Sequence, residues 1–292
     1  MTVEGFLLVD KPGGWTSHDV VAKTRGLART RKIGHAGTLD PMATGLLVLG
    51  VGRATRLLRF VQHLPKEYVA RAQLGIATDT LDADGTEVER APLPVERDEV
   101  AAAMAAFVGP IEQVPPMVSA IKIDGQKLYE LARRGKEVER PARSVHIHEF
   151  ELTGFEPGDY PVAEFRVVCS SGTYVRTLAD DIGRALGGRA HLVGLRRTRI
   201  GSLTVDDASP LDELIDDPDQ LPGRMLSFSQ GLADLSHIAV DDELAGRIGH
   251  GSVLSLQELP IEGPTAVVDG DGSLIAIYAR HGSGVKPEVV VA

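Results

Sequence analysis

The chain of 292 residues has one cysteine (Cys169), one tryptophan and only 4% aromatic residues. A single cysteine cannot form an internal disulfide or a thiolate zinc site, so it fits a reducing compartment. No stretch approaches 18 uninterrupted apolar residues, and no basic region precedes the short apolar run at the start. These absences predict neither a membrane span nor a signal peptide, and a location in the cytoplasm.

Motifs for common cofactors and for hydrolases are also missing. Gly50-Val51-Gly52 lacks the third glycine of a dinucleotide fingerprint, and no Gly-Lys-Ser/Thr phosphate loop occurs. The run Asp82-Ala83-Asp84-Gly85 resembles part of a calcium loop, but Ala91 stands where that loop needs a carboxylate, so the run indicates an acidic turn. His146 and His148 would share a strand face without a third ligand nearby in sequence. These motifs therefore indicate neither a nucleotide site nor a metal site.

Charge is distributed unevenly along the chain. The net charge is −10, from 31 Lys and Arg against 41 Asp and Glu. Residues 1–76 carry +6, residues 77–112 carry −7, residues 113–146 carry +3 and residues 206–292 carry −12. A polyanionic partner is therefore expected to bind the first two thirds of the chain rather than its acidic C-terminal part.

Periodicity and turn residues predict an α+β fold with a β-rich C-terminal part. Expected strands cover 6–10, 46–51, 145–152, 162–170, 192–198 and 200–205, and expected helices cover 16–28, 54–62, 98–108, 126–134 and 175–186. Thr16 and Asp19 have the spacing of a capping box at the first helix. The acidic run 212–222 is the best linker candidate. Short strands near 237–241, 253–258, 265–269 and 274–279 predict a small barrel.

The loop 34–45 is the strongest candidate for chemistry. Its sequence, GHAGTLDPMATG, contains three glycines and a proline and precedes a predicted buried strand. Irregular loops beside a rigid sheet often carry functional residues. By itself Asp40 could equally be a turn residue, because Asp-Pro is a common turn dipeptide. His35 alone would more often be a satisfied loop histidine than a functional one.

Four segments in register carry a family resemblance. Residues 34–56, GHAGTLDPMATGLLVLGVGRATR, closely resemble the catalytic motif of the bacterial tRNA pseudouridine-55 synthases, the TruB family. LLVDKPGGWTSHDVV at 7–21, KEYVA at 66–70, and SGTYVRTL at 171–178 with LRRT at 195–198 also match. The resemblance implies a mixed, largely antiparallel sheet flanked by helices in a catalytic domain (1–225), followed by a small β-barrel-like PUA domain (237–292).

The resemblance also implies a reaction. Members of the family isomerise uridine to pseudouridine without a cofactor by breaking the N1–C1′ bond, turning the base and joining C5 to C1′. Asp40 stands at the catalytic position, and Arg176 matches the arginine that pairs with it. Tyr68 matches the aromatic residue that stacks on the target base, and its hydroxyl is a candidate for handling the C5 proton. Attack on the base, attack on the sugar and removal of a sugar proton by the carboxylate all stay open.

Further positions match residues that bind RNA in the family. Tyr174 and Leu195 match positions that line the uridine pocket, and His35 matches the residue that fills the vacancy left by a flipped base. Lys11 and Lys32 are expected to contact the substrate. The exposed basic cluster to which Lys32 belongs comprises Lys23, Arg25, Arg29, Arg31 and Lys32. A basic segment at about 115–143 resembles the family's thumb, which closes over the T arm.

The sequence departs from the family pattern in two ways. Ala36 stands where the family often has threonine, which removes one hydroxyl group from the loop. The C-terminal part carries most of the −12 of residues 206–292, whereas a PUA domain that grips an acceptor stem should have a basic face. Either a few residues such as Arg247, Arg280 and Lys286 form that face, or this part contributes little to RNA binding, and we favour the second.

Together these observations predict a monomeric enzyme that converts uridine 55 in the T loop of tRNA to pseudouridine. The T arm of tRNA is the expected partner, and no membrane contact is expected. Two alternatives stay open: a tRNA-folding chaperone that binds the T arm, and a pseudouridine synthase that acts on another RNA.

Overall fold

The computed structural model describes residues 3–117, 122–123, 126–127 and 138–291. The chain forms two compact units. The first comprises Met1–Pro41, Gly45–Leu64 and Arg199–Ala292, and the second comprises Met42–Thr44 and Pro65–Thr198. The division into domains 1–225 and 237–292 rests on the sequence and stays a prediction.

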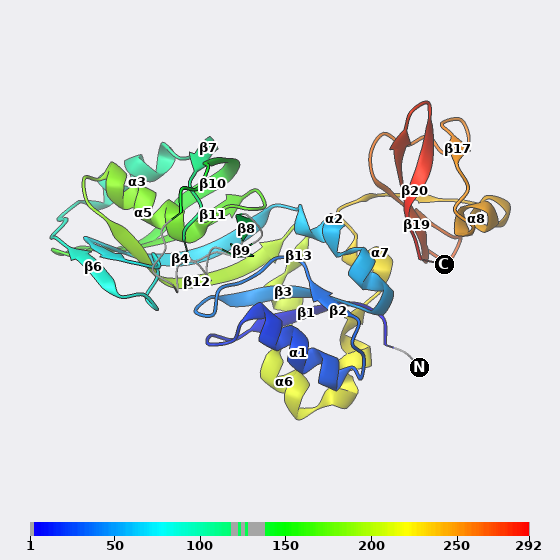
Figure 1. Ribbon diagram of the computed structural model, residues 1–292, viewed down its shortest axis with the longest axis horizontal. Coiled ribbons are helices and arrows are strands. Elements are labelled where there is room, and N and C mark those ends of the chain that lie inside the picture. The colour runs from blue at the N-terminus through cyan, green and yellow to red at the C-terminus, as the bar shows by residue number, and fades with distance from the viewer. Residues whose placement is uncertain (1–2, 118–121, 124–125, 128–137, 292) are drawn as a thin grey trace. The chain divides into compact units, whose positions relative to one another are not determined.

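Strand β1 organises the sheet of the first unit (Figure 1). Its partners are β3 and β15, which run antiparallel to it, and β14, which runs parallel; β2 pairs with β3. The strand bounds are β1 Gly5–Lys11, β2 Ile33–His35, β3 Thr44–Val51, β14 Ser209–Pro210 and β15 Met225–Leu226. The predicted strands at 6–10 and 46–51 are therefore confirmed.

Both faces of β1 are buried. Leu7 and Val9 belong to one hydrophobic cluster, together with residues of helices α1 (Ser17–Leu27) and α6 (Leu211–Asp216). Phe6 and Leu8 belong to a second cluster on the opposite side. Burial on both faces accounts for the continuous apolar run in the sequence of this strand.

Helix α1 begins with the predicted capping box. The Thr16 hydroxyl accepts a hydrogen bond from the Asp19 backbone N–H (3.1 Å), and the Asp19 carboxylate accepts one from the Thr16 N–H (2.9 Å). Two backbone donors at the start of the helix are satisfied in this way. The cap fixes where the chain turns from β1 into α1, directly beside the loop that carries Asp40.

The acidic run 212–222 is not a linker, so that prediction was wrong. It forms most of α6 and of the 3-10 helix η3 (Pro218–Arg224). Leu211, Leu214 and Leu221 are at most 2% exposed and pack in the same cluster as Leu7 and Val9. Three leucines among many acidic residues are too few to produce a detectable period, yet they bury the segment against the core.

The predicted helix 54–62 is divided in two. Residues Gly52–Arg56 form the 3-10 helix η1 and Leu58–Gln62 form the short helix α2. Ala54, Leu57, Leu58 and Val61 are buried, while the three arginines of this stretch are exposed. The division leaves Arg53, Arg56 and Arg59 on the solvent side.

The C-terminal part of the first unit is a small curled sheet with the strand order β16-β18-β19-β20-β17. Its elements are β16 Ser236–Ala239, α8 Asp242–Gly249, β17 Leu254–Ser255, β18 Thr265–Val268, β19 Leu274–His281 and β20 Gly284–Val290. The barrel-like character expected from the sequence is confirmed, but α8 and β20 were not predicted. The apolar core of this part contains Ile248, Tyr278 and Val285.

The second unit contains strands in the order β12-β4-β11-β10-β7. Their bounds are β4 Lys66–Leu74, β7 Gly109–Gln113, β10 Arg143–Glu156, β11 Val162–Cys169 and β12 Ala190–Ile200. The last two residues of β12 belong to the first unit, where the strand pairs with β13 (Leu203–Thr204). Helices α3 (Arg97–Ala105) and α5 (Val175–Ala185) contact each other, and α3 contacts β10 (Figure 1). A hairpin joins β5 (Ile76–Thr78) to β6 (Glu87–Arg90).

The basic segment at 115–143 lies mainly outside the described residues. Gln126–Lys127 forms β9, which pairs with β8 (Lys122–Ile123). The predicted helix 126–134 is therefore wrong at its first two residues, and its remainder falls outside the described part. No helix in the described part of the chain is long and apolar enough to cross a membrane.

Candidate active site

The loop that carries Asp40 is fastened on both sides of this residue. Before it, the Leu39 N–H donates to the Ser17 hydroxyl (2.8 Å), which in turn donates to the Leu39 carbonyl (3.2 Å). After it, the Pro41 carbonyl accepts hydrogen bonds from the Gly14 N–H (2.9 Å) and from the Lys11 ammonium (3.3 Å). Asp40 itself is half-buried. The backbone of the loop is thus held by residues 11–17, from the end of β1 to the start of α1.

Lys11 is fully buried, and its charge is directed at backbone oxygens. Besides the Pro41 carbonyl, its Nζ donates to the carbonyls of Pro12 (2.9 Å) and Trp15 (2.7 Å). These three carbonyls belong to two separate turns of the chain, which the ammonium joins. Lys11 thus joins these two turns through backbone hydrogen bonds, and its contact with the substrate stays a prediction.

Two of the glycines in this loop have a backbone geometry that favours glycine. Gly37 and Gly45 have φ values of 103° and 98°, a region that side-chain-bearing residues rarely adopt. His35, at the start of the loop, lies edge-on to the ring of His18, with the ring centroids 5.5 Å apart. Lys32 is exposed just before β2. The contacts of His35 and Lys32 with RNA stay predictions.

Arg176 forms a buried ion pair with Asp82. Its Nη1 lies 3.1 Å from Asp82 Oδ2 and donates to the Thr80 carbonyl at 2.9 Å. The two side chains are 3% and 6% exposed. Thr80 and Asp84 in turn donate hydrogen bonds to Asp82 Oδ1. Because the guanidinium is bound through a carboxylate and a carbonyl, its orientation is fixed; its pairing with Asp40 stays a prediction.

Asp82 is the residue of this site that the sequence analysis missed. The acidic turn that it was expected to form is present: the Gly85 N–H donates to the Asp82 carbonyl at 3.2 Å. The turn pairs with β12 through a bridge between Asp82 and Leu192. The only available signal was a carboxylate among small residues, and nothing local links it to an arginine 94 positions later.

Tyr68 lies on the buried face of β4. Alternate residues of this strand are buried, so Lys66 and Tyr68 face the same side at 6% and 7% exposure. Lys66 pairs in the sheet with Cys169.

Burial raises the pKa of the Cys169 thiol to about 11. The single cysteine is therefore a protonated thiol at neutral pH and not a thiolate nucleophile.

Because the Lys66 ammonium is buried, we expect the stability of the protein to depend on pH in an unusual way. Burial, followed by the nearby Arg197 guanidinium, lowers the pKa of Lys66 from 10.5 to about 8. Between these values the unfolded chain binds more protons than the folded one, so stability should rise with pH. The substitution Lys66→Met is expected to raise the free energy of unfolding at pH 7 by up to about 3 kcal/mol.

The measurement is urea denaturation of both proteins at several pH values. The gain from Lys66→Met should shrink as the pH rises from 8 to 10.5. Parallel stability curves for the two proteins over this range would contradict the buried ammonium as the cause.

Tyr174 and Leu195 are half-buried in the second unit. Tyr174 is the N-cap residue of α5, two positions before Arg176, and its side chain makes no capping hydrogen bond. Leu195 lies on β12, the strand next to the one that carries Tyr68. The second unit therefore contains Tyr68, Tyr174, Arg176 and Leu195, whereas Asp40 belongs to the first unit.

His146 and His148 form an exposed pair, with ring centroids 4.7 Å apart. In the described ranges, no group of three or more His, Cys, Asp or Glu side chains is placed to hold a metal.

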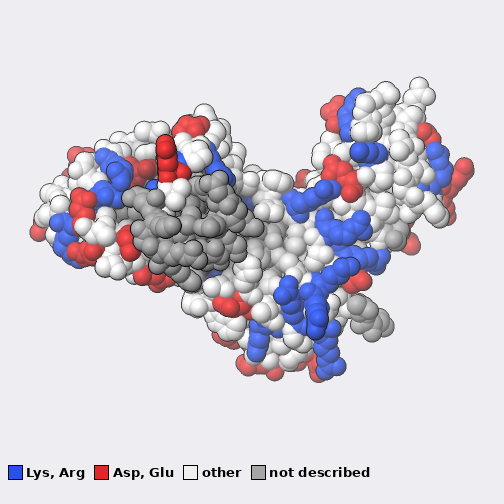
Figure 2. All heavy atoms as spheres, in the orientation of Figure 1, with Lys and Arg blue, Asp and Glu red and all other residues white. Residues whose placement is uncertain are grey.

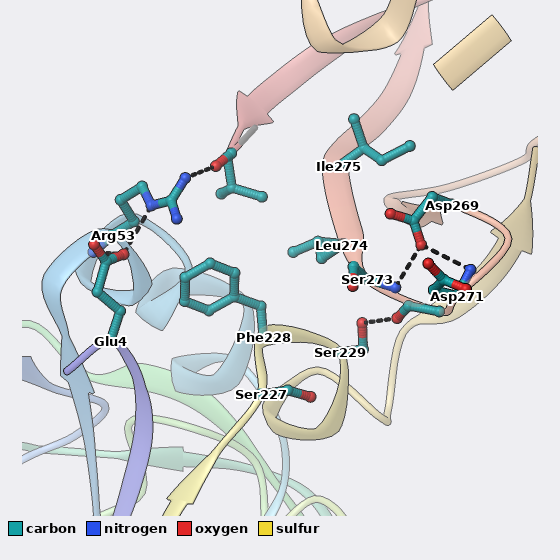
Figure 3. Close-up of a pocket in the computed structure, with 12 residues that line it drawn as sticks. Glu4, Arg53, Ser227, Phe228, Ser229, Asp269, Asp271, Ser273, Leu274 and Ile275 are labelled. Atoms are coloured by element: carbon teal, nitrogen blue, oxygen red, sulfur yellow. Dashed lines mark hydrogen bonds and ion pairs between the residues drawn. The ribbon is translucent and has the colours of Figure 1, made fainter. Parts of the chain in front are cut away.

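A pocket of about 630 Å³ lies in the first unit (Figure 3), where Arg53, Phe228 and Asp269 line it. None of the residues that line this pocket is a predicted site residue.

Comparison with known proteins identifies the family. The description "TruB family pseudouridylate synthase (N terminal domain)" matches residues 25–175, "tRNA pseudouridylate synthase B C-terminal domain" matches 176–222, and "tRNA Pseudouridine synthase II, C terminal" matches 235–292. The tRNA pseudouridine synthase B of Thermobifida fusca is 45% identical over 295 residues, with 99% of each chain covered. That of Paenarthrobacter aurescens is 43% identical over 300 residues, with 99% of this chain and 96% of the relative covered.

The fold agrees with this assignment. A chain of a solved Cbf5-Nop10-Gar1 complex superposes with a TM-score of 0.76 at 26% identity, covering 99% of this chain and 85% of that one. The four sequence segments, the α+β fold and the full-length similarity to curated relatives lead to one conclusion. The chain belongs to the TruB family of pseudouridylate synthases.

Proposed function

We propose that the protein converts uridine 55 in the T loop of tRNA to pseudouridine, with Asp40 as the catalytic carboxylate. Membership of the family supports pseudouridine formation, and the names of its relatives specify tRNA. The observation that carries the assignment of Asp40 is the double fastening of its loop. Hydrogen bonds to Leu39 and Pro41 hold the residues on either side of it. Such fixed backbone geometry is what a positioned catalytic group requires.

The reaction is an isomerisation and needs no external reactant. The N1–C1′ bond breaks, the base turns and the C5–C1′ bond forms; C5 loses its proton and N1 gains one. An ionised carboxylate at the sugar or the base can support this exchange. Burial of a carboxylate in a closed site would favour its neutral form unless a cation compensates. In this proposal Arg176 is that cation, and the Asp82 carboxylate keeps its guanidinium oriented.

The remaining site residues bind the target nucleotide in this proposal. Tyr68 stacks on the uracil ring, a contact that contributes about 1–3 kcal/mol per base. Tyr174 and Leu195 line the pocket, and His35 occupies the space that the flipped base leaves in the T loop. Recognition then depends on the shape of the loop and on one extruded base. We further propose that the protein acts as a monomer in the cytoplasm.

A basic surface of the first unit supports RNA as the partner. Figure 2 shows Lys and Arg side chains gathered over the region of β2 and α2. Exposed members of this basic surface are Arg29, Arg31, Lys32, Arg53, Arg56 and Arg59. The acidic C-terminal part adds no comparable charge of its own, but its last strand helps to order this surface: Arg56 donates to the Val290 carbonyl (2.9 Å) and Arg59 pairs with Glu288 (2.7 Å).

This surface yields a prediction on salt dependence. Arg56→Gln removes one cation from the basic surface and is expected to lower the slope of log K against log salt for tRNA binding by about 1. Fluorescence anisotropy at several salt concentrations measures the slope. Arg90→Gln is the matched control, because Arg90 lies on β6 and is paired with Glu87. Equal slopes for wild type and Arg56→Gln would remove this residue from the interface.

The proposed function is tested by mapping the product. Wild-type protein is incubated with unmodified tRNA, with a T-arm hairpin and with a ribosomal RNA fragment, and pseudouridine is located by position. Product at position 55 of tRNA and in the hairpin is expected. Product only in the ribosomal fragment would indicate a synthase for another RNA. Accelerated tRNA folding without any pseudouridine would indicate a chaperone.

A further inference from the structure

A buried glutamine holds the backbone of Tyr174. Gln113 is the last residue of β7 and is 2% exposed. Its Oε1 accepts a hydrogen bond from the Tyr174 N–H at 2.7 Å, and its Nε2 donates to the Tyr174 carbonyl at 3.1 Å. One side-chain amide thus satisfies both backbone groups of one residue, as a neighbouring strand would.

The residue that is held in this way begins helix α5. Tyr174 is the N-cap, with extended φ and ψ of −99° and 104°, and its carbonyl accepts the first helical hydrogen bond from Leu178 (3.0 Å). The direction in which the chain enters the helix is therefore set at Tyr174. Arg176 lies in the first turn, two residues further on. Any shift of the Tyr174 backbone would change the position of both side chains.

The hydrogen-bonding pattern calls for an amide rather than for an apolar residue of the same size. A buried backbone N–H without a partner costs about 1–3 kcal/mol, so an apolar side chain at position 113 would fill the space and leave a donor unsatisfied. Gln113 is itself fixed, because it pairs with Arg143 at the end of the β7–β10 ladder. The amide is thus held by the sheet and holds the start of the helix.

We propose that Gln113 is a positioning residue for turnover, which acts through the backbone of Tyr174 and thereby sets Tyr174 and Arg176. The inference rests on the proposed function, in which these two side chains form part of the uridine site. It assigns a role in the reaction to a residue of β7 that does not belong to any of the four sequence segments of the family resemblance.

The first test is Gln113→Met, which keeps the length of the side chain and removes the amide. The single-turnover rate of pseudouridine formation in unmodified tRNA is expected to fall by 10-fold to about 10²-fold, because small displacements of site residues have effects of this size. The dissociation constant for tRNA should stay within about threefold of the wild-type value, since Gln113 is buried, uncharged and not a member of the proposed basic surface.

Gln73→Met is the matched control. Gln73 lies on β4 in the same unit, and its amide also donates to backbone carbonyls, those of Tyr160 (2.6 Å) and Pro161 (3.2 Å). Loss of these bonds is expected to leave the single-turnover rate unchanged. A wild-type rate in folded Gln113→Met would overturn the inference, and so would an equal loss of rate in both variants.

A double variant tests whether Gln113 acts through Tyr174. If it does, combining Gln113→Met with Tyr174→Ala should slow the reaction by clearly less than the product of the two single effects. Fully multiplicative effects would contradict the proposed route.

Gln113→Glu covers the case in which Gln113→Met does not fold, because a protonated carboxyl group has the donor and acceptor pattern of the amide. Its rate relative to wild type should rise as the pH is lowered, and a flat ratio would overturn the inference.

The failure of this inference is distinguishable from failure of the proposed function. If wild-type protein forms no pseudouridine in tRNA, the proposed function fails, whatever the variants do. If wild-type protein is active and Gln113→Met is equally fast, only the role of Gln113 is lost.

Discussion

Asp40→Asn is expected to reduce pseudouridine formation by at least about 10³-fold, while tRNA binding changes little. Asparagine has almost the same shape as aspartate, so the loop should keep its hydrogen bonds through Leu39 and Pro41. The variant lacks the carboxylate that, in the proposed function, attacks the base or the sugar or takes up a proton. Single-turnover assays at saturating enzyme measure the rate, and anisotropy measures the affinity for tRNA.

Asp271→Asn provides the matched control in the same unit. Asp271 lies on an exposed turn between β18 and β19, and its N–H donates to Asp269. The control should keep the wild-type rate. Undiminished activity of Asp40→Asn would disprove the catalytic assignment, and a parallel loss of affinity and rate would indicate a role in binding instead.

Asp82→Ala is expected to lower both stability and turnover. The substitution leaves the Arg176 guanidinium, 3% exposed, without its carboxylate. Removing one partner of a buried ion pair typically costs about 3–5 kcal/mol, because the other charge stays buried. Turnover should fall by about 10²-fold, since the guanidinium is no longer held in one orientation. Urea denaturation gives the stability, and single-turnover assays give the rate.

Two further variants separate charge from shape in this pair. Asp82→Asn keeps the hydrogen-bond acceptor and should lose less stability than Asp82→Ala. Glu87→Ala breaks an exposed ion pair, in which the Arg90 side chain is 49% exposed and the Glu87 side chain 43%. This control should leave turnover unchanged. If Asp82→Ala unfolds at the wild-type urea concentration, the pair is not what holds Arg176.

Local patterns predicted much of the architecture correctly. The capping box of Thr16 and Asp19, the strands around 6–10 and 46–51, and the helix that begins near residue 175 are all present. Each depends on residues close together in sequence, where periodicity and cap chemistry act directly. The errors occurred where local signals were weak, as in the run 212–222, whose two buried leucines, Leu214 and Leu221, are surrounded by acidic residues in the sequence.

The sequence by itself determined the family, because four motifs in register specify it, and it singled out the loop around Asp40 as the candidate for chemistry. Only the tertiary structure revealed how the site residues are held. Asp82 and Arg176 are 94 positions apart, and Gln113 and Tyr174 are 61 apart. Such pairs form because the sheet brings distant segments together, and a buried charge or amide is stable only where a partner of matching geometry meets it. Which residue becomes that partner depends on the tertiary fold and not on neighbouring residues in the chain.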